Sequence, residues 1–549
     1  SMDRAFAAQN KTVQLGRLRF GGAYGSPQFT TTGGNGYAIE FTNGVEMAGR
    51  DGLLTPAAVV IPITIGGNIT GNGTFIRSQN WQPELYINTA STGNSGNGNV
   101  LSNSVTWFGR YGGSTALRDL NATSKLATGG VTVMRDSVVQ FTAATNLYEG
   151  QQVDLYSSLT QFAVLGIADN SPVSAYNLRT PWATGPARAS ALSTPLAGSG
   201  VIALNSYYTQ PVDLSRVGEG TWFLASYGNG VGMFGTYNGP AMVPGAAYSG
   251  AGNALPTYRL GGAGSQFNIG VYPGDVASTP NQLTGAANVV IGNGYVNYGA
   301  TQSRLTGGTT VFNTAQNYTG STVVNAGMTL EVRGAMATSG YDVFGGLTVG
   351  GLATLGNASV TLRPGSTLLL DNTFDLTAGG VGRAGTGRNL VVNGATLRGQ
   401  GSFVADVVEP IDTVTVVGQA SIVPRYMMNG RSMTISIGNL VQDANKGIAN
   451  IAPNGAGLLG IQERVMISGT APTLTSGMVA PWMVNLTDTQ FLTYGELGFT
   501  NAGFNTVASA GGSIPTTYTG VERMLLNTGA ATLAVGGTVD VYALRADVN

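Results

Sequence analysis

The chain has 549 residues, far more than the ~250–300 at which a single globular core stops growing, so we expect several domains or a fold that grows by repetition. Only 10% of the residues are charged and the formal net charge is −1, which excludes the electrostatic nucleic-acid binding that clustered Lys and Arg provide. The chain has no His and no Cys, which excludes Ser-His-Asp and Cys-His catalysis and any disulfide.

The remaining composition predicts an ordered, all-β chain. Hydrophobic residues make up 42% of the sequence, and this content with little net charge argues against disorder. β-branched residues interrupted by Gly and Asn are typical of short strands and tight turns. No run of 18 apolar residues occurs, so we expect no transmembrane segment in this chain.

Alternation of apolar and polar residues predicts short strands along the whole chain. In chain order they include 59–69 (VVIPITIGGNI), 130–134 (GVTVM), 413–417 (TVTVV) and 432–437 (SMTISI). Residues 80–105 are rich in Asn, Ser and Gly and are expected to form a long polar loop. Residues 172–200 have few apolar runs and are expected to be a boundary or an excursion from the regular structure.

A Thr-Leu pair placed a few residues after a Gly or Asn recurs between residues 325 and 399. The copies are NAGMTLEV (325–332), NASVTLRP (357–364), PGSTLLL (364–370) and NGATLRG (393–399). Thr329 and Thr361 are 32 residues apart, and Thr361 and Thr396 are 35 apart. These intervals match one or two coils of a β-solenoid of roughly 20–30 residues per coil. In such a coil Gly or Asn takes the corner and the next strand points alternate side chains inward.

Two further pairs of similar segments lie far apart in the chain. TGNGTFI (70–76) and RGQGSFV (398–404) both fit x-G-x-G-[ST]-F-[VI]. TVQLGRLR (12–19) and TVDVYALR (538–545) both fit T-V-x-[LV]-x-x-L-R. The second match predicts either repeated modules of a longer precursor or two ends that occupy equivalent places at successive interfaces. The predicted assembly residues are Thr12, Val13, Leu15, Leu18, Arg19, Thr538, Val539, Val541, Leu544 and Arg545.

The stretch NYTGSTVVNAGMTLEV (317–332) resembles the autotransporter-associated β-strand repeat, the passenger repeat of bacterial autotransporter-type secreted proteins. The pattern is carried by Asn317, Tyr318, Gly320, Thr322, Val324, Gly327, Leu330 and Val332. LGRLRFGG (15–22) and ITGNGTFIRSQNWQPELYI (69–87) are similar to the lead-in coils of this family. PWMVNLTDTQFLTYGELGF (481–499) is similar to the terminal part of long repeat-bearing surface proteins.

The resemblance implies a parallel β-helix outside the bacterial cell that acts as a stalk, adhesin or display scaffold. The fold class expected is all-β, a right-handed parallel β-helix (solenoid) with loop or β-sandwich-like excursions. We expect Val324, Leu330 and Val332 to fill its interior and Glu331 to face solvent. Four regions are predicted: N-terminal coils in 1–100, an irregular β-rich insertion in 101–285, regular repeats in 286–410, and C-terminal coils with a terminal pairing strand in 411–549.

Candidate sites are few. A glycoside hydrolase needs two carboxylates about 5–9.5 Å apart; Asp371 and Asp375 are the nearest pair in sequence, and Asp169 and Asp213 lie in predicted loops. A strand-end Asp that caps backbone amides is the simpler interpretation of Asp371. The Gly-rich runs 228–232, 261–265 and 379–385 lack the residues of a phosphate loop or a calcium nonapeptide and are interpreted as turns, although a structural calcium ion stays possible.

Aromatic side chains could stack on sugars, and the candidates are Trp81 with Tyr86, Trp107 with Tyr111, and Tyr207 with Tyr208. Core filling is the favoured interpretation of these pairs. The leading hypothesis is an extracellular structural protein, without cofactor or catalytic residues, that associates end to end. An adhesin or glycan-binding domain, with surface glycans as partners of loops in 80–125 and 170–255, is the alternative, and a polysaccharide-acting enzyme comes third.

Overall fold

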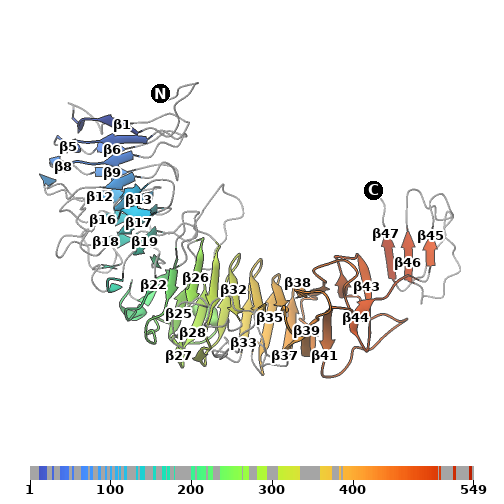
Figure 1. The fold of residues 1–549 in the computed structure, drawn as a ribbon. Coiled ribbons are helices and arrows are strands. Elements are labelled where there is room, and N and C mark those ends of the chain that lie inside the picture. Colours follow the sequence, from blue (N-terminus) through green and yellow to red (C-terminus); the bar gives the residue numbers. More distant parts are fainter. Residues whose placement is uncertain are drawn as a thin grey trace. The chain divides into compact units, whose positions relative to one another are not determined.

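The computed structural model contains strands, turns and short 3-10 helices, and no α-helix occurs among the residues that it describes (Figure 1). The predicted all-β class is confirmed. The 3-10 helices include η4 (Leu214–Arg216) and η6 (Ser249–Ala251). The residues described are 12–21, 28–29, 38–48, 52–54, 63–71, 75–77, 85–87, 93–94, 99–101, 105–108, 110–112, 117–119, 131–133, 137–141, 153–155, 163–167, 170–173, 178–179, 200–204, 207–217, 220–226, 235–261, 264–270, 281–292, 307–333, 359–373, 383–384, 387–504, 506–508, 523–526 and 543–546.

The chain divides into two compact units, Ser1–Leu330 and Glu331–Asn549. The division falls inside the predicted repeat region 286–410. It also falls within strand β32 (Thr329–Arg333). The two units are described separately below.

The first unit is built on a long sheet in which every neighbouring pair of strands is parallel. Several of these strands lie in the predicted insertion 101–285, so that region contributes to the same sheet as its flanks. In order the strands are β1 (Thr12–Leu15), β4 (Ala38–Phe41), β7 (Ile63–Ile65), β10 (Leu85–Ile87), β13 (Val105–Phe108), β17 (Ser137–Phe141), β19 (Ala163–Ile167), β21 (Val201–Leu204), β23 (Phe223–Ala225), β25 (Thr257–Leu260), β28 (Asn288–Ile291) and β31 (Thr322–Val324).

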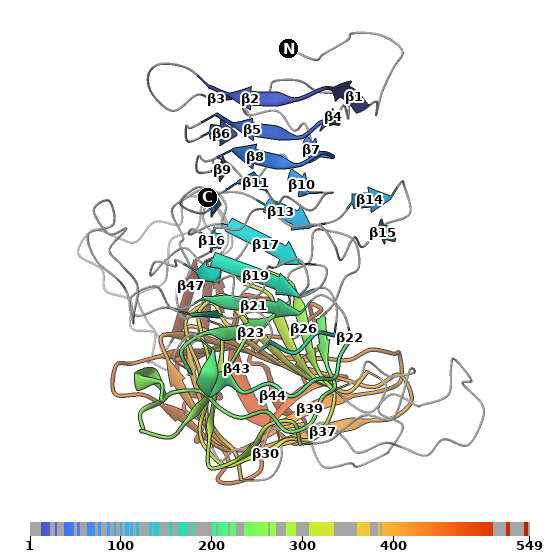
Figure 2. The ribbon, with the colours of Figure 1, turned by 90° about the vertical axis from the view of Figure 1, so that its left-hand side faces the viewer.

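Two further parallel sheets accompany the first strands of this unit, so that consecutive strands stack in sets of three (Figure 2). The second sheet contains β2 (Leu18–Phe20), β5 (Val45–Met47), β8 (Ile69–Gly71) and β11 (Gly93–Asn94). The third contains β3 (Gln28–Phe29), β6 (Gly52–Leu54), β9 (Phe75–Arg77), β12 (Asn99–Leu101), β16 (Val131–Val133), β18 (Val153–Leu155) and β20 (Leu178–Arg179).

Later strands of the first unit continue the parallel pattern. β22 (Tyr207–Tyr208), β24 (Gly235–Tyr237), β26 (Gln266–Ile269) and β29 (Thr309–Phe312) pair in that order, and β27 (Thr284–Gly285) pairs with β30 (Asn317–Tyr318). The hairpin of β14 (Arg110–Gly112) and β15 (Leu117–Asp119) is antiparallel and stands apart from the long sheets.

The second unit contains two parallel sheets whose strands alternate along the chain. One holds β33 (Ser359–Leu362), β35 (Asn389–Asn393), β37 (Val407–Val417), β39 (Met433–Gln442) and β41 (Glu463–Ile467). The other holds β34 (Thr367–Asp371), β36 (Thr396–Gln400), β38 (Gln419–Arg425), β40 (Ile448–Ile451) and β42 (Met483–Asn485). β43 (Gln490–Gly495) and β44 (Gly498–Asn501) follow as antiparallel strands. A separate parallel sheet contains β45 (Thr506–Ala508), β46 (Arg523–Leu526) and β47 (Ala543–Ala546).

Parallel pairing in register places like side chains on top of one another. In the first unit Leu165, Ile202, Leu224, Leu260, Ile291 and Val324 follow one another in register and are all buried. In the second unit Leu368, Leu397, Ile422 and Ile451 do the same. These stacks of buried side chains form the apolar core of each unit. Burying each such side chain stabilises the fold by about 1.5–3 kcal/mol.

The repeat-like stretch 317–332 contributes to this core as expected. Val324, Leu330 and Val332 are fully buried, which confirms the prediction for these three. Gly327 forms a corner with φ +71°, a conformation that favours glycine. Gly320 has a different reason: a Cβ there would lie 2.4 Å from the carbonyl oxygen of Ala287 in the neighbouring strand region. The two glycines of the pattern are therefore explained by a turn and by a close approach.

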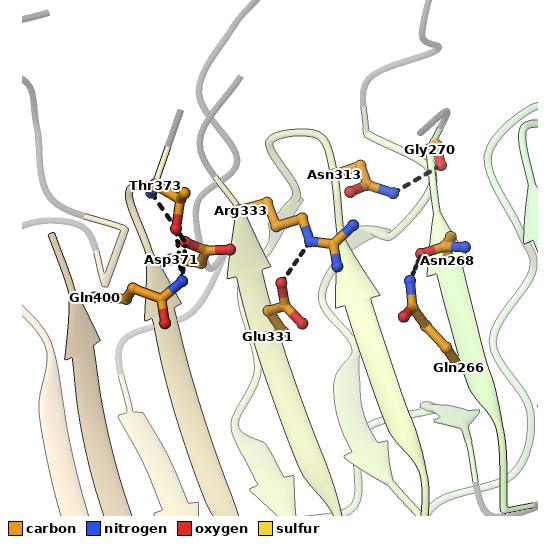
Figure 3. Close-up of polar contacts among 9 residues, drawn as sticks. All are labelled: Gln266, Asn268, Gly270, Asn313, Glu331, Arg333, Asp371, Thr373 and Gln400. Atoms are coloured by element: carbon orange, nitrogen blue, oxygen red, sulfur yellow. Dashed lines mark hydrogen bonds and ion pairs between the residues drawn. The ribbon is translucent and has the colours of Figure 1, made fainter. Parts of the chain in front are cut away.

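Amides at the strand ends connect successive coils. Asn325 Nδ2 donates to the carbonyl oxygen of Gly292 at 2.5 Å, across 33 residues of chain. Asn313 Nδ2 donates to Gly270 O at 3.2 Å, across 43 residues (Figure 3). Each bond satisfies a buried polar group that the corner would otherwise leave without a partner.

Three predictions about local structure are wrong. Glu331 does not face solvent: it is buried and forms an ion pair with Arg333. Residues 80–105 are not one long loop, because they contain β10, β11 and β12. Parallel ladders are made by the backbone, so Asn- and Gly-rich segments can join them without an alternating apolar pattern.

The third correction concerns the repeat register. Thr396 lies opposite Thr367, not Thr361, and Thr361 lies opposite Val391 in the other sheet. The Thr-Leu pair therefore occurs in strands of both sheets, β33 in one and β34 and β36 in the other. The similar segments TGNGTFI and RGQGSFV have different local structures, since Phe75 lies in β9 whereas Phe403 lies in an exposed bend.

Neighbouring leucines of β34 test the inward and outward faces. Leu368 is fully buried and Leu369 is half-buried on the outer face. We expect Leu368→Ala to lower the free energy of unfolding by about 2–5 kcal/mol, because it leaves a cavity in the stack. The matched control Leu369→Ala is expected to cost clearly less. Urea denaturation followed by circular dichroism measures both, and equal losses would contradict the assignment of faces.

Gly320→Ala tests the close approach between coils. The added methyl group would meet backbone atoms of residue 287, so we expect a loss of about 1–3 kcal/mol from overpacking. Gly495→Ala is the control, because a Cβ at Gly495 has no atom within 4 Å. Thermal unfolding of the two variants compares them, and a variant Gly320→Ala as stable as Gly495→Ala would disprove the steric account.

Candidate functional site

The predicted N-terminal assembly residues lie on β1 and β2. Among the described residues, β4 is the one strand that pairs with β1. Leu15 is 39% exposed, whereas Val13 and Leu18 are partly buried. Arg19 Nε lies 3.1 Å from Glu46 Oε1, an exposed ion pair that joins the first two coils.

The predicted C-terminal counterpart is described only in part. Thr538, Val539 and Val541 lie outside the described residues. Leu544 and Arg545 lie in β47, which pairs with β46 alone in the part of the chain that is described. Leu544 is 50% exposed, and Arg545 donates to the carbonyl oxygen of Thr489 and lies over the Phe504 ring at 5.8 Å. In the sequence match β47 therefore corresponds to β2, since Leu18-Arg19 aligns with Leu544-Arg545.

At the last strands of the two parallel sheets in the second unit, described residues of an antiparallel hairpin make hydrogen bonds. The antiparallel strands β43 and β44 follow β42, and Tyr494 of β43 reaches the last strand of the other sheet. Its hydroxyl donates to Ile467 O at 3.1 Å and accepts from Ile467 N at 2.8 Å. This hairpin satisfies edge groups of β41 in the way that natural proteins protect exposed strands.

The carboxylates considered for catalysis are dispersed. Asp375 and Asp169 lie outside the described residues. Asp213 caps η4 by accepting from Ser215 N at 3.0 Å and pairs with Arg216 at 3.3 Å. Asp371 accepts from Thr373 N at 2.9 Å at the end of β34, as the interpretation of a strand-end cap predicted. Asp371 and Asp213 are thus engaged in local structure.

Asp371 nevertheless has a carboxyl neighbour that sequence spacing did not indicate. Figure 3 shows Glu331, Arg333, Asp371 and Gln400 side by side on adjacent strands of the second unit. Gln400 Nε2 donates to Asp371 Oδ1 at 3.0 Å. Burial raises the pKa of Glu331, Arg333 opposes this effect, and a hydrogen bond with Asp371 adds to it. Both carboxyl groups are buried, which leaves little access for a substrate.

Two further glutamates are fully buried in the second unit. Glu409 accepts from Asn372 Nδ2 at 2.6 Å, and its pKa is raised by burial, which outweighs that bond and the charge of Arg383. Glu463 accepts from the backbone N–H groups of Tyr426, Asn454 and Gly455 at 3.1, 2.5 and 3.3 Å. Burial raises the pKa of Glu463 as well. Each is a buried polar group with a structural role in the loops around it.

The aromatic pairs proposed for sugar stacking divide between core and surface. Tyr208 is fully buried and its hydroxyl bridges Ser171 O and Val173 N, which confirms core filling. Tyr207 is exposed and accepts a hydrogen bond from Asn238 Nδ2 at 2.5 Å. Trp81 lies outside the described residues, and the side chains of Tyr86, Trp107 and Tyr111 are not described. Of these candidate pairs, Tyr207 is the one residue whose described side chain is exposed.

A cleft of about 480 Å³ opens on the second unit, beside the ends of β38 and β40. Its lining side chains are Arg425, Tyr426, Met427, Met428, Asn429 and Asn454. Arg398 on the neighbouring strand β36 donates through Nη2 to Asn454 Oδ1 at 3.1 Å. These residues lie on β36 and at the ends of β38 and β40, which are far apart in the sequence, so no local motif could have indicated the cleft.

No protein-family model, curated protein or solved structure matches the chain. Across the described residues, no group of three or more acidic side chains is placed to hold a metal ion. The same part of the chain holds no helix with the length and hydropathy of a membrane span.

Buried Glu409 makes stability depend on pH in a definite direction. Because its pKa is raised in the folded state, Glu409 favours folding most below the ordinary Glu pKa of about 4.3 and loses this contribution as pH rises through the raised value. We expect the stability of Glu409→Gln relative to wild type to increase from pH 4 to pH 7. Urea denaturation at the two pH values measures the difference.

Asp443 provides a control of opposite sign. It is exposed, and hydrogen bonds from Asn445 lower its pKa, so its contribution is lost as pH falls. Asp443→Asn is therefore expected to be less stable than wild type at pH 7 and to approach it at acidic pH. For the Glu409 prediction, parallel pH profiles of wild type and Glu409→Gln would contradict a raised pKa of Glu409 in the folded state.

Proposed function

We propose that the chain is a right-handed parallel β-helix that serves as an extracellular structural protein: a stalk, fibre or surface-layer subunit on a bacterial cell. The observation that carries the proposal is the in-register stacking of strands from successive segments of chain. Thr12 lies opposite Ala38 and Ile39 opposite Ile63, returns of 26 and 24 residues. Returns of this length match the coils of a β-solenoid.

The handedness follows from a general rule for parallel strands. Crossover connections between parallel strands of one sheet are right-handed in about 98% of cases. The extracellular setting is supported by the resemblance of residues 317–332 to the passenger repeat of autotransporter-type proteins. The low charge and the absence of His and Cys are consistent with a protein whose shape is its function and that needs no catalytic residues.

End-to-end association through the terminal strands is the second part of the proposal. β1 and β47 each have one strand neighbour among the described residues, and the sequences around them match. Strand addition at such an edge supplies main-chain hydrogen bonds. A head-to-tail contact of this kind forms a filament when its rotation does not close into a ring.

Removal of residues 1–20 tests the association. This deletion removes β1 and β2, so the new edge lacks the T-V-x-[LV]-x-x-L-R sequence, and we expect filaments to disappear while the remaining strands stay folded. Removal of residues 1–11 is the control, since it leaves both strands in place. Negative-stain electron microscopy with far-UV circular dichroism compares the two. Normal filaments from the longer deletion would refute association through this edge.

A point variant addresses the same edge without removing a coil. Leu15→Lys places a charge on exposed β1, and edge lysines oppose strand addition, so we expect at least a tenfold rise in the concentration needed for assembly. Leu474→Lys is the matched control at a similarly exposed position of the second unit. Light scattering against protein concentration measures both variants. Full-length protein that stays monomeric at every concentration would contradict the association itself.

A further inference from the structure

Two arginines on adjacent strands lie at the cleft beside β38: Arg425 lines it, and Arg398 is bonded to the lining residue Asn454. Arg425 lies opposite Gln400 in the parallel register, and Arg398 lies two residues before Gln400 on β36. Buried Leu397 and Gly399 flank Arg398 in the strand, so its side chain lies on the outer face, as does that of Arg425. Two positive groups therefore lie close together on one surface of the second unit.

These guanidinium groups have few partners. Within the part of the chain that the structure describes, neither forms an ion pair within 4.0 Å. Arg425 Nη1 makes a long hydrogen bond of 3.4 Å to Gln400 Oε1. Arg398 Nε is buried without a hydrogen-bond partner, although its Nη2 reaches Asn454. A buried donor without a partner costs about 1–3 kcal/mol, so these groups are poised to gain from an anion.

The nearest buried carboxylate does not serve as that anion. Glu463 Oε1 accepts from Tyr426 N, and Oε2 accepts from the N–H groups of Asn454 and Gly455. Those bonds tie together the two segments that form the cleft walls, the one after β38 and the one after β40. Glu463 thus positions the walls of the cleft. Its hydrogen bonds go to backbone N–H groups and not to the two arginines.

The electrostatics of Arg398 agree with this geometry. Burial lowers its pKa, and the neighbouring charge of Arg425 lowers it further, while Glu463 and Asp371 act in the opposite direction. The dominant effects are desolvation and repulsion between like charges. A bound anion would offset the cost of desolvation and the repulsion between the two arginines. Guanidinium groups form short, two-pronged hydrogen bonds with carboxylate and sulfate oxygens.

The rest of the cleft limits the class of ligand. A volume of about 480 Å³ exceeds the needs of a single inorganic anion and lies in the range of small-molecule sites. Asn429 and Asn454 offer amide donors and acceptors, which suit hydroxyl groups, and Tyr426 offers a ring face on which a sugar can stack. The cleft is open to solvent, so a chain could extend beyond it.

We propose that this cleft, which we call the Arg398–Arg425 cleft, binds an acidic saccharide whose anionic group lies between the two guanidinium groups. Tyr426 contacts the sugar ring, and Asn429 and Asn454 bind its hydroxyls. The proposal does not depend on the filament described above, since the cleft belongs to the second unit alone. It would give a structural protein a specific contact with an acidic polysaccharide.

Isothermal titration calorimetry of the full chain tests the cleft with three probes: oligogalacturonate, a sulfated chondroitin oligosaccharide and a neutral xylo-oligosaccharide. At least one acidic probe is expected to bind, more weakly as salt increases, and the neutral probe to bind at least tenfold more weakly. The better of the two acidic probes identifies the anionic group as carboxylate or sulfate. No binding of either acidic probe, or equal binding of the neutral probe, would overturn the proposal.

Variants connect binding to the named residues. Arg425→Ala is expected to weaken binding of the acidic probe at least about tenfold, and Arg425→Lys to weaken it less, because charge is kept and the two-pronged geometry is lost. Arg464→Ala is the matched control, since Arg464 lies on β41 and donates to Ile461 O at 2.8 Å outside the cleft. Circular dichroism verifies that each variant is folded. If Arg425→Ala does not fold, the binding measurement uses Arg425→Lys instead. Unchanged affinity in a folded Arg425 variant, or an equal loss in Arg464→Ala, would contradict the assignment.

Discussion

Parallel hydrogen bonding between strands from successive segments of the chain is the interaction on which the rest of this protein depends. Each strand must meet the strand one coil earlier in register, because a shift of one residue would turn its inward side chains outward. The length of chain between strands can vary as long as the register is kept. Val201 meets Phe223 after 22 residues, whereas Val164 meets Val201 after 37. Variation is therefore confined to the connections.

The same constraint determines where polar groups can be buried. Corners bring backbone carbonyls of neighbouring coils close together, and side-chain amides such as Asn325 and Asn313 satisfy them. Inside the second unit, Glu463 satisfies three backbone N–H groups and Glu409 meets Asn372. A buried charge is costly unless it is hydrogen-bonded, so these glutamates define specific loop positions. The Arg398–Arg425 cleft depends on one of them.

Parallel sheets also have edges, and the protein treats its edges in different ways. Tyr494 of the β43–β44 hairpin bonds both backbone groups of Ile467, the last residue of β41. β1 and β47 have a single neighbour each in the described residues. The proposed end-to-end association assigns strand addition to β1 and β47.

The sequence by itself determined the all-β class, the glycine positions of the repeat and the burial of Val324, Leu330 and Val332, because alternation and corner residues are local properties. The strands within 80–105, the register of Thr367 with Thr396 and the burial of Glu331 were decided by the tertiary structure. Each depends on which segment lies one coil away, and sequence spacing leaves that open when connection lengths vary. The cleft has the same origin: Arg398, Arg425 and Asn454 are brought together by the parallel pairing of β36, β38 and β40, which no local pattern specifies.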